Sequence, residues 1–144
     1  MELLPITAEL AASPAVASSP LMCEVCEANI ALYPDGRPPL PWAGYLAREQ
    51  DVIVGTCAFK SQPEDGAVEI AYFTFPGHEG QGVATRMAGE LLQVTAGHGL
   101  RTVRAQTLPE ENASTAVLRK LGFTCIGPVE HPTDGTVWEW QRPA

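Results

Sequence analysis

The sequence predicts an α/β protein whose sheet is mixed and mostly antiparallel, with one parallel pair of strands at its centre. From Trp42 onward, three strand-like stretches follow one another, the second and third rich in β-branched and aromatic residues, and the apolar period then changes from two residues to about 3.6. A strand, a helix and another strand follow one another across this change. Such a strand–helix–strand unit, with its right-handed crossover, sets its two strands side by side and parallel.

The stretch that begins at Trp42 opens with strand-forming residues, interrupted twice by residues that favour tight turns. Short turns join antiparallel neighbours, so we expect these strands to form a meander. The predicted strands are residues 43–49, 52–60 and 67–75, and the predicted turns are Gln50–Asp51 and residues 63–66.

Helical periodicity follows the third of these strands. Val83, Met87, Leu91 and Val94 recur at helical spacing and would share one face of a helix that ends at Gly97. A second helix is predicted where an asparagine can cap the first turn and a glycine can end the last. The remaining predicted elements are a strand at 102–108, parallel to 68–75, a helix at 112–122, and a terminal hairpin of strands at 123–130 and 136–141.

A chain of 144 residues is expected to form a single domain, residues 1–144. The patterned part, residues 42–144, is the predicted core. An atypical segment, residues 1–41, precedes it, and within this segment only residues 22–33 have the pattern of a short helix. We therefore expect the functional site within residues 42–144.

The cysteines and histidines do not predict a metal centre. Cys23 and Cys26 form a C-x-x-C pair, but no second pair of zinc ligands follows. His78, His98 and His131 fall in separate predicted loops. Cys57 and Cys125 lie in apolar, strand-like runs, so we expect four reduced thiols, two of them in the core, and no bound metal.

Composition excludes several classes of function. A net charge of −8 disfavours a nucleic acid partner, since phosphate backbones reward clustered Lys and Arg. No apolar run reaches the roughly 18 residues that a membrane-spanning helix needs, and the N-terminus lacks the pattern of a secretory signal. We therefore expect a cytoplasmic protein with no membrane or nucleic acid partner.

The stretch GHEGQGVAT, residues 77–85, stands between a predicted strand and a predicted helix. A helix begins with N–H groups that lack internal acceptors, its dipole is positive at that end, and glycines allow close backbone approach. These properties together make a cradle for phosphate. The stretch is not a P-loop, because it has no lysine, and Thr85 breaks the dinucleotide-binding pattern.

Three stretches together resemble the GNAT family of N-acetyltransferases. EGQGVA at 79–84 is similar to the family motif [RQ]-x-x-G-x-[GA], PEENASTAVLRKLGF at 109–123 resembles its second signature, and VEIAYFTF at 68–75 resembles its central splayed strand. The resemblance covers about residues 42–144 and is nearest to the ribosomal-protein-alanine branch. It implies the acyl-CoA N-acyltransferase fold and an enzyme that transfers an acetyl group from acetyl-CoA to a primary amine.

The resemblance also implies how acetyl-CoA is held. The glycine-rich turn would wrap the diphosphate with its backbone N–H groups, and the backbone of the splayed strand would pair with the pantetheine arm. The segment around residue 112 would approach the cofactor from the second helix. The implied cofactor-binding residues are Phe73, Thr74, Phe75, Glu79, Gly80, Gln81, Gly82, Val83, Ala84, Thr85, Asn112 and Ser114.

Two residues are implied to be catalytic. Glu69 occupies a place in the central strand where some relatives use a glutamate as base through water, and an apolar strand would raise its pKa. Many relatives have an acidic tyrosine at the position of Leu118, so this sequence departs from the pattern. Ser114 then becomes the candidate that stabilises the CoA thiolate, with helix capping as the structural alternative for Ser114 and Asn112.

Other functions stay open at this point. The acceptor could be a protein N-terminus, an amino acid or polyamine, or an aminoglycoside-like amine, and the chain could form a homodimer. The alternative to an enzyme is a module that binds acyl-CoA, or a regulatory protein, without turnover. The unusual stretch EENAS keeps this alternative open.

Overall fold

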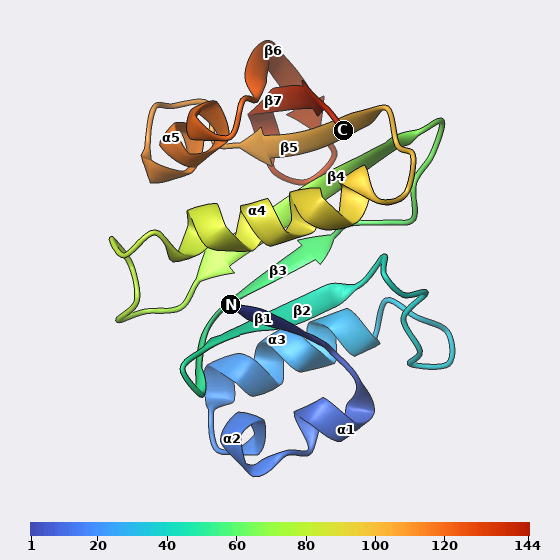
Figure 1. The fold of residues 1–144 in the computed structure, drawn as a ribbon, viewed down its shortest axis with the longest axis vertical. Coiled ribbons are helices and arrows are strands. Elements are labelled where there is room, and N and C mark those ends of the chain that lie inside the picture. Colours follow the sequence, from blue (N-terminus) through green and yellow to red (C-terminus); the bar gives the residue numbers. More distant parts are fainter.

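The computed structural model describes all 144 residues and contains one seven-stranded sheet in the order β1-β2-β3-β4-β5-β7-β6 (Figure 1). Only β4 and β5 pair in parallel, so the predicted fold class is confirmed. The strands are β1 (Glu2–Pro5), β2 (Gly44–Glu49), β3 (Val52–Phe59), β4 (Ala67–Thr74), β5 (Thr102–Thr107), β6 (Thr124–His131) and β7 (Gly135–Pro143), and the helices are α1 (Ala8–Ala11), α2 (Pro14–Ala17), α3 (Pro20–Ile30), α4 (Val83–Ala96) and α5 (Ala113–Lys120).

The predicted meander is present as β2, β3 and β4. Gln50 and Asp51 join β2 to β3 with φ angles of 49° and 64°, and the second turn has Asp65 at 52° and Gly66 at 76°. Positive φ at successive residues is what a tight hairpin requires, since it matches the twist of the strands. The turn residues therefore set the antiparallel order of these strands.

The parallel pair of β4 and β5 is short. It runs from Ala67 opposite Thr102 to Glu69 opposite Arg104, and the two strands then continue without pairing. A gap therefore opens in the sheet beyond Glu69, as the predicted splayed pair requires. We call this feature the β4–β5 gap, and it leaves one edge of β4 without a neighbouring strand.

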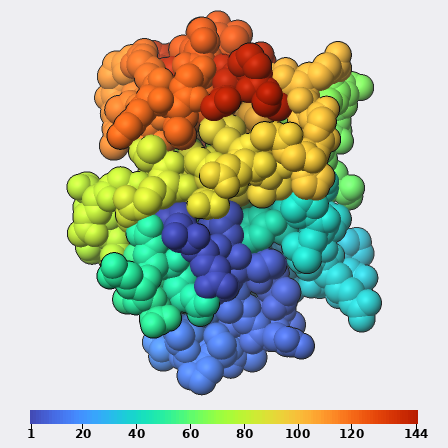
Figure 2. All heavy atoms as spheres, viewed as in Figure 1, coloured from blue at the N-terminus to red at the C-terminus, as the bar shows by residue number.

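The two faces of the sheet carry different amounts of buried apolar surface. Alternate residues of a strand point to opposite faces of the sheet. Val68 and Ile70 of β4 point to one face and belong to the larger core, which includes Met87 and Leu91 of α4. Phe75, just beyond the strand, instead joins a smaller cluster with α2, α3 and β2. Figure 2 shows the N-terminal layer in blue at one end of the molecule and the C-terminal hairpin in red at the other, with α4 between them.

The segment of residues 1–41 has more structure than its pattern predicts. It forms β1, which adds an edge strand to β2, and three helices, where only residues 22–33 are predicted to be helical. Two of these helices span four residues each, too short for an apolar period to be visible. Side-chain caps mark the start of α1 and of the longer α3, because Thr7 accepts from the amide of Leu10 and Ser19 accepts from that of Met22.

All four cysteines are free thiols, as predicted. Cys57 is buried in the larger core, and this burial raises its pKa to about 12. The second fully buried cysteine is Cys26 in the smaller cluster, whereas Cys125, expected in the core from its apolar surroundings, is only partly buried. None of the helices combines the length and the apolar character that crossing a lipid bilayer demands.

Candidate active site

A cavity of about 370 Å³ lies where the glycine-rich turn, the end of β4 and the start of α5 come together. All of the predicted cofactor-binding residues line this cavity except Phe75, Gln81 and Asn112. Gln81 lines a neighbouring cavity of about 550 Å³ beside Arg86. The residues that line the first cavity are Tyr72, Phe73, Thr74, His78, Glu79, Gly80, Gly82, Val83, Ala84, Thr85, Ala113, Ser114 and Val117.

The turn has the backbone geometry of an anion cradle. Gly80 and Gly82 have φ angles of 74° and 77°, in the left-handed region that favours glycine, and Gly82 is the N-cap of α4. The first helical hydrogen bond runs from the amide of Arg86 to the carbonyl of Gly82. The preceding amides, from Gln81 to Thr85, donate to no protein group, so they remain free for a ligand.

Two carboxylates hold the turn in place. Glu79 accepts a 2.6 Å hydrogen bond from the amide of Gly77, within the turn itself. Glu49 at the end of β2 takes two hydrogen bonds from Arg86, at 2.6 and 2.8 Å, and Arg86 also donates to the carbonyl of Gln81 at 2.9 Å. The Arg86 hydrogen bond lowers the pKa of Glu49, which keeps this carboxylate ionised and the turn tied to the sheet.

The open edge of β4 offers fewer backbone groups than the sequence implies. The amide of Phe75 donates to Val54 at 2.9 Å, and the carbonyl of Glu69 accepts from Lys60 at 2.9 Å, so odd-numbered residues of this stretch face β3. Backbone groups alternate between the two edges of a strand. The groups that face the β4–β5 gap are therefore those of Tyr72 and Thr74, and the amide of Phe75 is not available to a ligand.

Ser114 lies in the first turn of α5 and lines the cavity. Its hydroxyl is 3.1 Å from the hydroxyl of Tyr72, which also lies 3.2 Å from the Ser114 carbonyl oxygen. Burial raises the pKa of Tyr72, and the hydrogen bond to Ser114 partly offsets this effect. The cavity thus contains a pair of hydroxyl groups, one from β4 and one from α5.

Asn112 is the N-cap of α5 and takes part in a reciprocal capping box. Its side-chain oxygen accepts from the amide of Thr115 at 3.1 Å, and the Thr115 hydroxyl accepts from the amide of Asn112 at 3.0 Å. The capping alternative therefore describes the contacts of Asn112, and Ser114 keeps its hydroxyl for the cavity.

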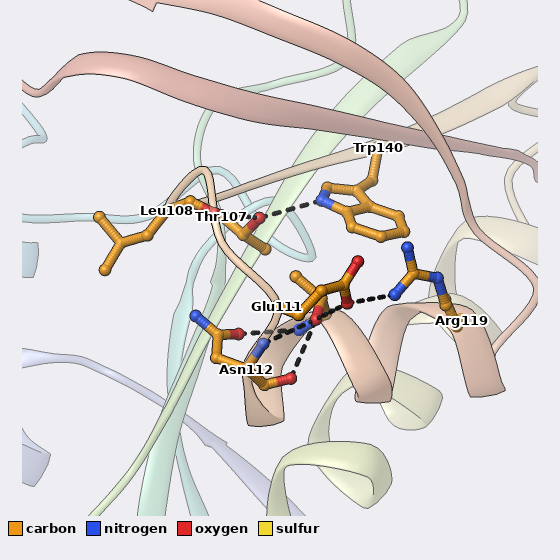
Figure 3. A network of polar contacts seen from close by, with 7 residues as sticks. Thr107, Leu108, Glu111, Asn112, Arg119 and Trp140 are labelled. Carbon is orange, nitrogen blue, oxygen red and sulfur yellow. Dashed lines mark hydrogen bonds and ion pairs between the residues drawn. The ribbon is translucent and has the colours of Figure 1, made fainter.

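Glu111 supports the same helix start from the outside (Figure 3). Its carboxylate accepts from the Thr115 hydroxyl at 3.0 Å and pairs with Arg119, and the hydrogen bond from Arg119 is the main cause that lowers the pKa of Glu111. The Arg119 guanidinium lies 5.1 Å from the ring centre of Trp140. This network anchors α5 against β7, which sets the position of Ser114.

Glu69 lies at the last paired position of β4, where the β4–β5 gap begins. It is not in the cavity that Ser114 lines. Its Oε2 is 2.9 Å from the Lys60 ammonium and has no other polar partner, and its side chain is 25% exposed. The apolar surroundings expected for this carboxylate are thus replaced by an ion pair, and its role as a base stays a prediction.

Several residues of the cavity are absent from the sequence-based set. Ala113 and Val117 line it from α5, and His78 lines it from the turn. Tyr72 is the fourth residue that lines the cavity without having been predicted to bind the cofactor. Its place next to Phe73 in the strand is the only sequence feature that could have indicated this position. The contact between Tyr72 and Ser114 joins residues 42 positions apart, so no local pattern reports it.

Comparison with protein families identifies the class of protein. The sequence profile described as the acetyltransferase (GNAT) domain matches residues 5–124. The chain therefore belongs to the GNAT acetyltransferase family, and the match includes most of the segment 1–41. No curated protein matches the sequence significantly.

Solved structures share the fold. RimL, a ribosomal-protein alpha-N-acetyltransferase, superposes with a TM-score of 0.72 and 22% identity over 99% of this chain and 98% of its own. Ribosomal-protein-alanine N-acetyltransferase from Brucella melitensis superposes with a TM-score of 0.62 and 16% identity, over 71% of this chain and 68% of its own. An aminoglycoside acetyltransferase in complex with coenzyme A superposes with a TM-score of 0.61 and 16% identity, over 70% of this chain and 65% of its own. These likenesses establish the acyl-CoA N-acyltransferase fold.

Family membership carries the general activity with it. The protein is an N-acetyltransferase that takes its acetyl group from acetyl-CoA and passes it to an amine. The predicted class of enzyme and the predicted co-substrate are confirmed.

Proposed function

We propose that the cavity between the glycine-rich turn and α5 holds acetyl-CoA, and that the acetyl group is transferred at the β4–β5 gap. The observation that carries this proposal is the run of free amides from Gln81 to Thr85, which opens a 14-residue helix beside that gap. The diphosphate would accept from these amides. The amides of the pantetheine arm would pair with the backbone of Tyr72 and Thr74, in place of a neighbouring strand.

The chemical step needs a proton acceptor for the amine and a group that stabilises the departing thiolate. Ser114 is proposed for the second role, because its hydroxyl lines the cavity beside the open edge of β4. Glu69 is proposed to take the amine proton through water, because it lies where the gap begins and alternates with Ala71 and Phe73 onto the face opposite α4. Lys60 must release this carboxylate before it accepts a proton.

The proposed acceptor is the α-amino group of a peptide or protein. Phe73 and Leu108, at the two sides of the β4–β5 gap, expose 51% and 59% of their surface. A bound peptide would cover apolar side chains of this size, whereas a small polar amine would leave them exposed to water. The full-length likeness to RimL supports the same acceptor class, and the aminoglycoside enzyme supports small amines as the second candidate.

Release of free thiol from acetyl-CoA tests this function. We expect release that depends on added peptides with a free N-terminus, with little response to aminoglycosides or polyamines. Ser114→Ala and Glu69→Gln should each lower kcat by about 10²-fold, the lower end of what general acid–base groups contribute. Binding of CoA without release for any amine would contradict the enzyme and favour a binding module.

Gly82→Val tests the turn itself. A side chain at φ 77° is strained and stands in the path of the phosphate, and a Cβ would lie 3.0 Å from the Arg86 guanidinium. We expect CoA affinity, measured by calorimetry, to fall by at least about 100-fold, since several charge-assisted hydrogen bonds are lost.

Gly89→Ala is the matched control, because it lies within the same helix and a Cβ there meets no atom within 4 Å. It should leave affinity unchanged and stabilise the helix by about 0.5 to 1 kcal/mol. Unchanged affinity in Gly82→Val would count against the phosphate assignment.

A further inference from the structure

Four residues that carry hydroxyl groups line the proposed cofactor cavity, namely Tyr72, Thr74, Thr85 and Ser114. Of these, only Tyr72 and Ser114 are hydrogen-bonded to each other, at 3.1 Å. The contact bridges the open edge of β4 and the first turn of α5, the two elements between which the thioester would lie. The hydroxyl of Tyr72 is therefore aimed at the group assigned to the leaving thiolate.

Helix α5 has no other side chain that could assist Ser114 from within the helix. Thr115 is 1% exposed and its hydroxyl is used by the capping box and by Glu111. Leu118, one turn further on, is fully buried in the larger core. Any group that orients the Ser114 hydroxyl must come from outside the helix, and Tyr72 is at hydrogen-bond distance.

We propose that Tyr72 is a positioning residue for acetyl transfer, whose hydroxyl donates to Ser114 Oγ and directs the serine hydrogen at the sulfur of CoA. A serine hydroxyl has one donor and can accept two hydrogen bonds, so accepting from Tyr72 leaves its own hydrogen free. The inference rests on the proposed function, in which Ser114 stabilises the thiolate.

The step balances without a further reagent. The acceptor nitrogen attacks the thioester carbon, the C–S bond breaks, and its electron pair goes to sulfur. The Ser114 hydroxyl donates a hydrogen bond to this thiolate, and Tyr72 holds Ser114 in that orientation. The nitrogen gives one proton through water to Glu69, which returns it to solvent, and the sulfur takes one proton from solvent, while both hydroxyl groups keep theirs.

Either hydroxyl can donate in the contact between Tyr72 and Ser114, and the phenol has a single hydrogen to give. Burial raises the pKa of Tyr72 above its ordinary value, so the phenol keeps its proton at neutral pH. Tyr72 can then donate, either to Ser114 Oγ or to the Ser114 carbonyl, both within 3.2 Å. Binding of a sulfur that accepts from Ser114 favours the first arrangement.

A double-mutant cycle tests the proposal on the full chain with acetyl-CoA and the peptide acceptor. Tyr72→Phe should lower kcat about tenfold, equivalent to about 1.4 kcal/mol, with KM for acetyl-CoA unchanged. In the Ser114→Ala background the same change should have no further effect, because its target is gone. Tyr45→Phe is the control, since the Tyr45 hydroxyl donates to the Pro41 carbonyl at 2.5 Å, outside the cavity, and its kcat should equal that of the wild type.

Each outcome decides the matter. A Tyr72→Phe enzyme with wild-type kcat overturns the positioning role, and so does a tenfold loss that persists in the Ser114→Ala background, because that result indicates a structural role. Wild-type kcat in Ser114→Ala also overturns it. If the wild-type chain releases no thiol with any amine, the proposed function fails together with the inference. Wild-type kcat in Ser114→Ala also removes the role proposed for Ser114, whereas the two Tyr72→Phe outcomes leave the proposed function standing.

Discussion

Trp140 is the largest fully buried side chain, and its indole N–H has one partner. It donates to the Thr107 hydroxyl at 3.0 Å, and Thr107 is itself 7% exposed (Figure 3). A buried indole N–H without an acceptor destabilises the folded state, because it has lost its hydrogen bonds to water and gains none in the protein. This hydrogen bond links β5 to β7 at the level where β5 has already parted from β4.

Thr107→Val should therefore destabilise the protein by about 1 to 3 kcal/mol, because it keeps the shape of the side chain and leaves the indole unpaired. Urea unfolding followed by tryptophan fluorescence measures the effect. Thr107→Ser retains the acceptor and should lose less stability than Thr107→Val. Equal losses in the two variants would mean that packing, and not the hydrogen bond, decides the stability here.

At the scale of elements, the start of α5 connects stability to the site. The capping box of Asn112 and Thr115 fixes the first turn, and Ser114 lies inside that turn. An uncapped helix frays from its end, so a lost cap would also displace the Ser114 hydroxyl. The residues that end a short helix thus influence a group proposed to contact the cofactor.

Asn112→Ala should cost about 1 kcal/mol of stability, while Asn112→Asp, which is also a good cap, should cost a few tenths at most. Thermal unfolding gives the stability, and calorimetry gives the affinity for CoA. We expect CoA affinity to follow stability across the two variants. Weak binding by a fully stable Asn112→Asp would instead assign Asn112 the cofactor contact that the family resemblance implies.

At the scale of the whole molecule, the sheet separates two unequal layers. The larger core, on the α4 face, contains 17 buried residues, and the smaller cluster, under α1, α2 and α3, contains five. Figure 2 shows the N-terminal layer at one end of the molecule. Less buried apolar surface means less free energy opposing local opening.

Native-state hydrogen exchange should therefore rank the helices. Amides of α3 should exchange through openings of lower free energy than those of α4, although both helices lie on the same sheet. Mass spectrometry of peptides from residues 20–30 and 83–96 gives the comparison. Protection of α3 equal to that of α4 would show that the two layers open as one unit.

Much of this architecture is determined by local sequence. The strands at 43–49, 52–60 and 67–75 and the helix from Val83 are predictable because their patterns repeat over at least six residues and end at turn formers. The glycine-rich turn is predictable for the same reason, since φ 77° at Gly82 and a helix immediately after it are local properties. The family and its co-substrate follow from this part of the chain.

Only the tertiary structure decides the remaining features. The four-residue strand and helices of the N-terminal segment are too short to form a period, and packing against the sheet selects them. The ion pair of Glu69 with Lys60 and the contact of Tyr72 with Ser114 depend on which strands and helices become neighbours. Sequence patterns record the conformation of adjacent residues, whereas these contacts arise between residues brought together by folding.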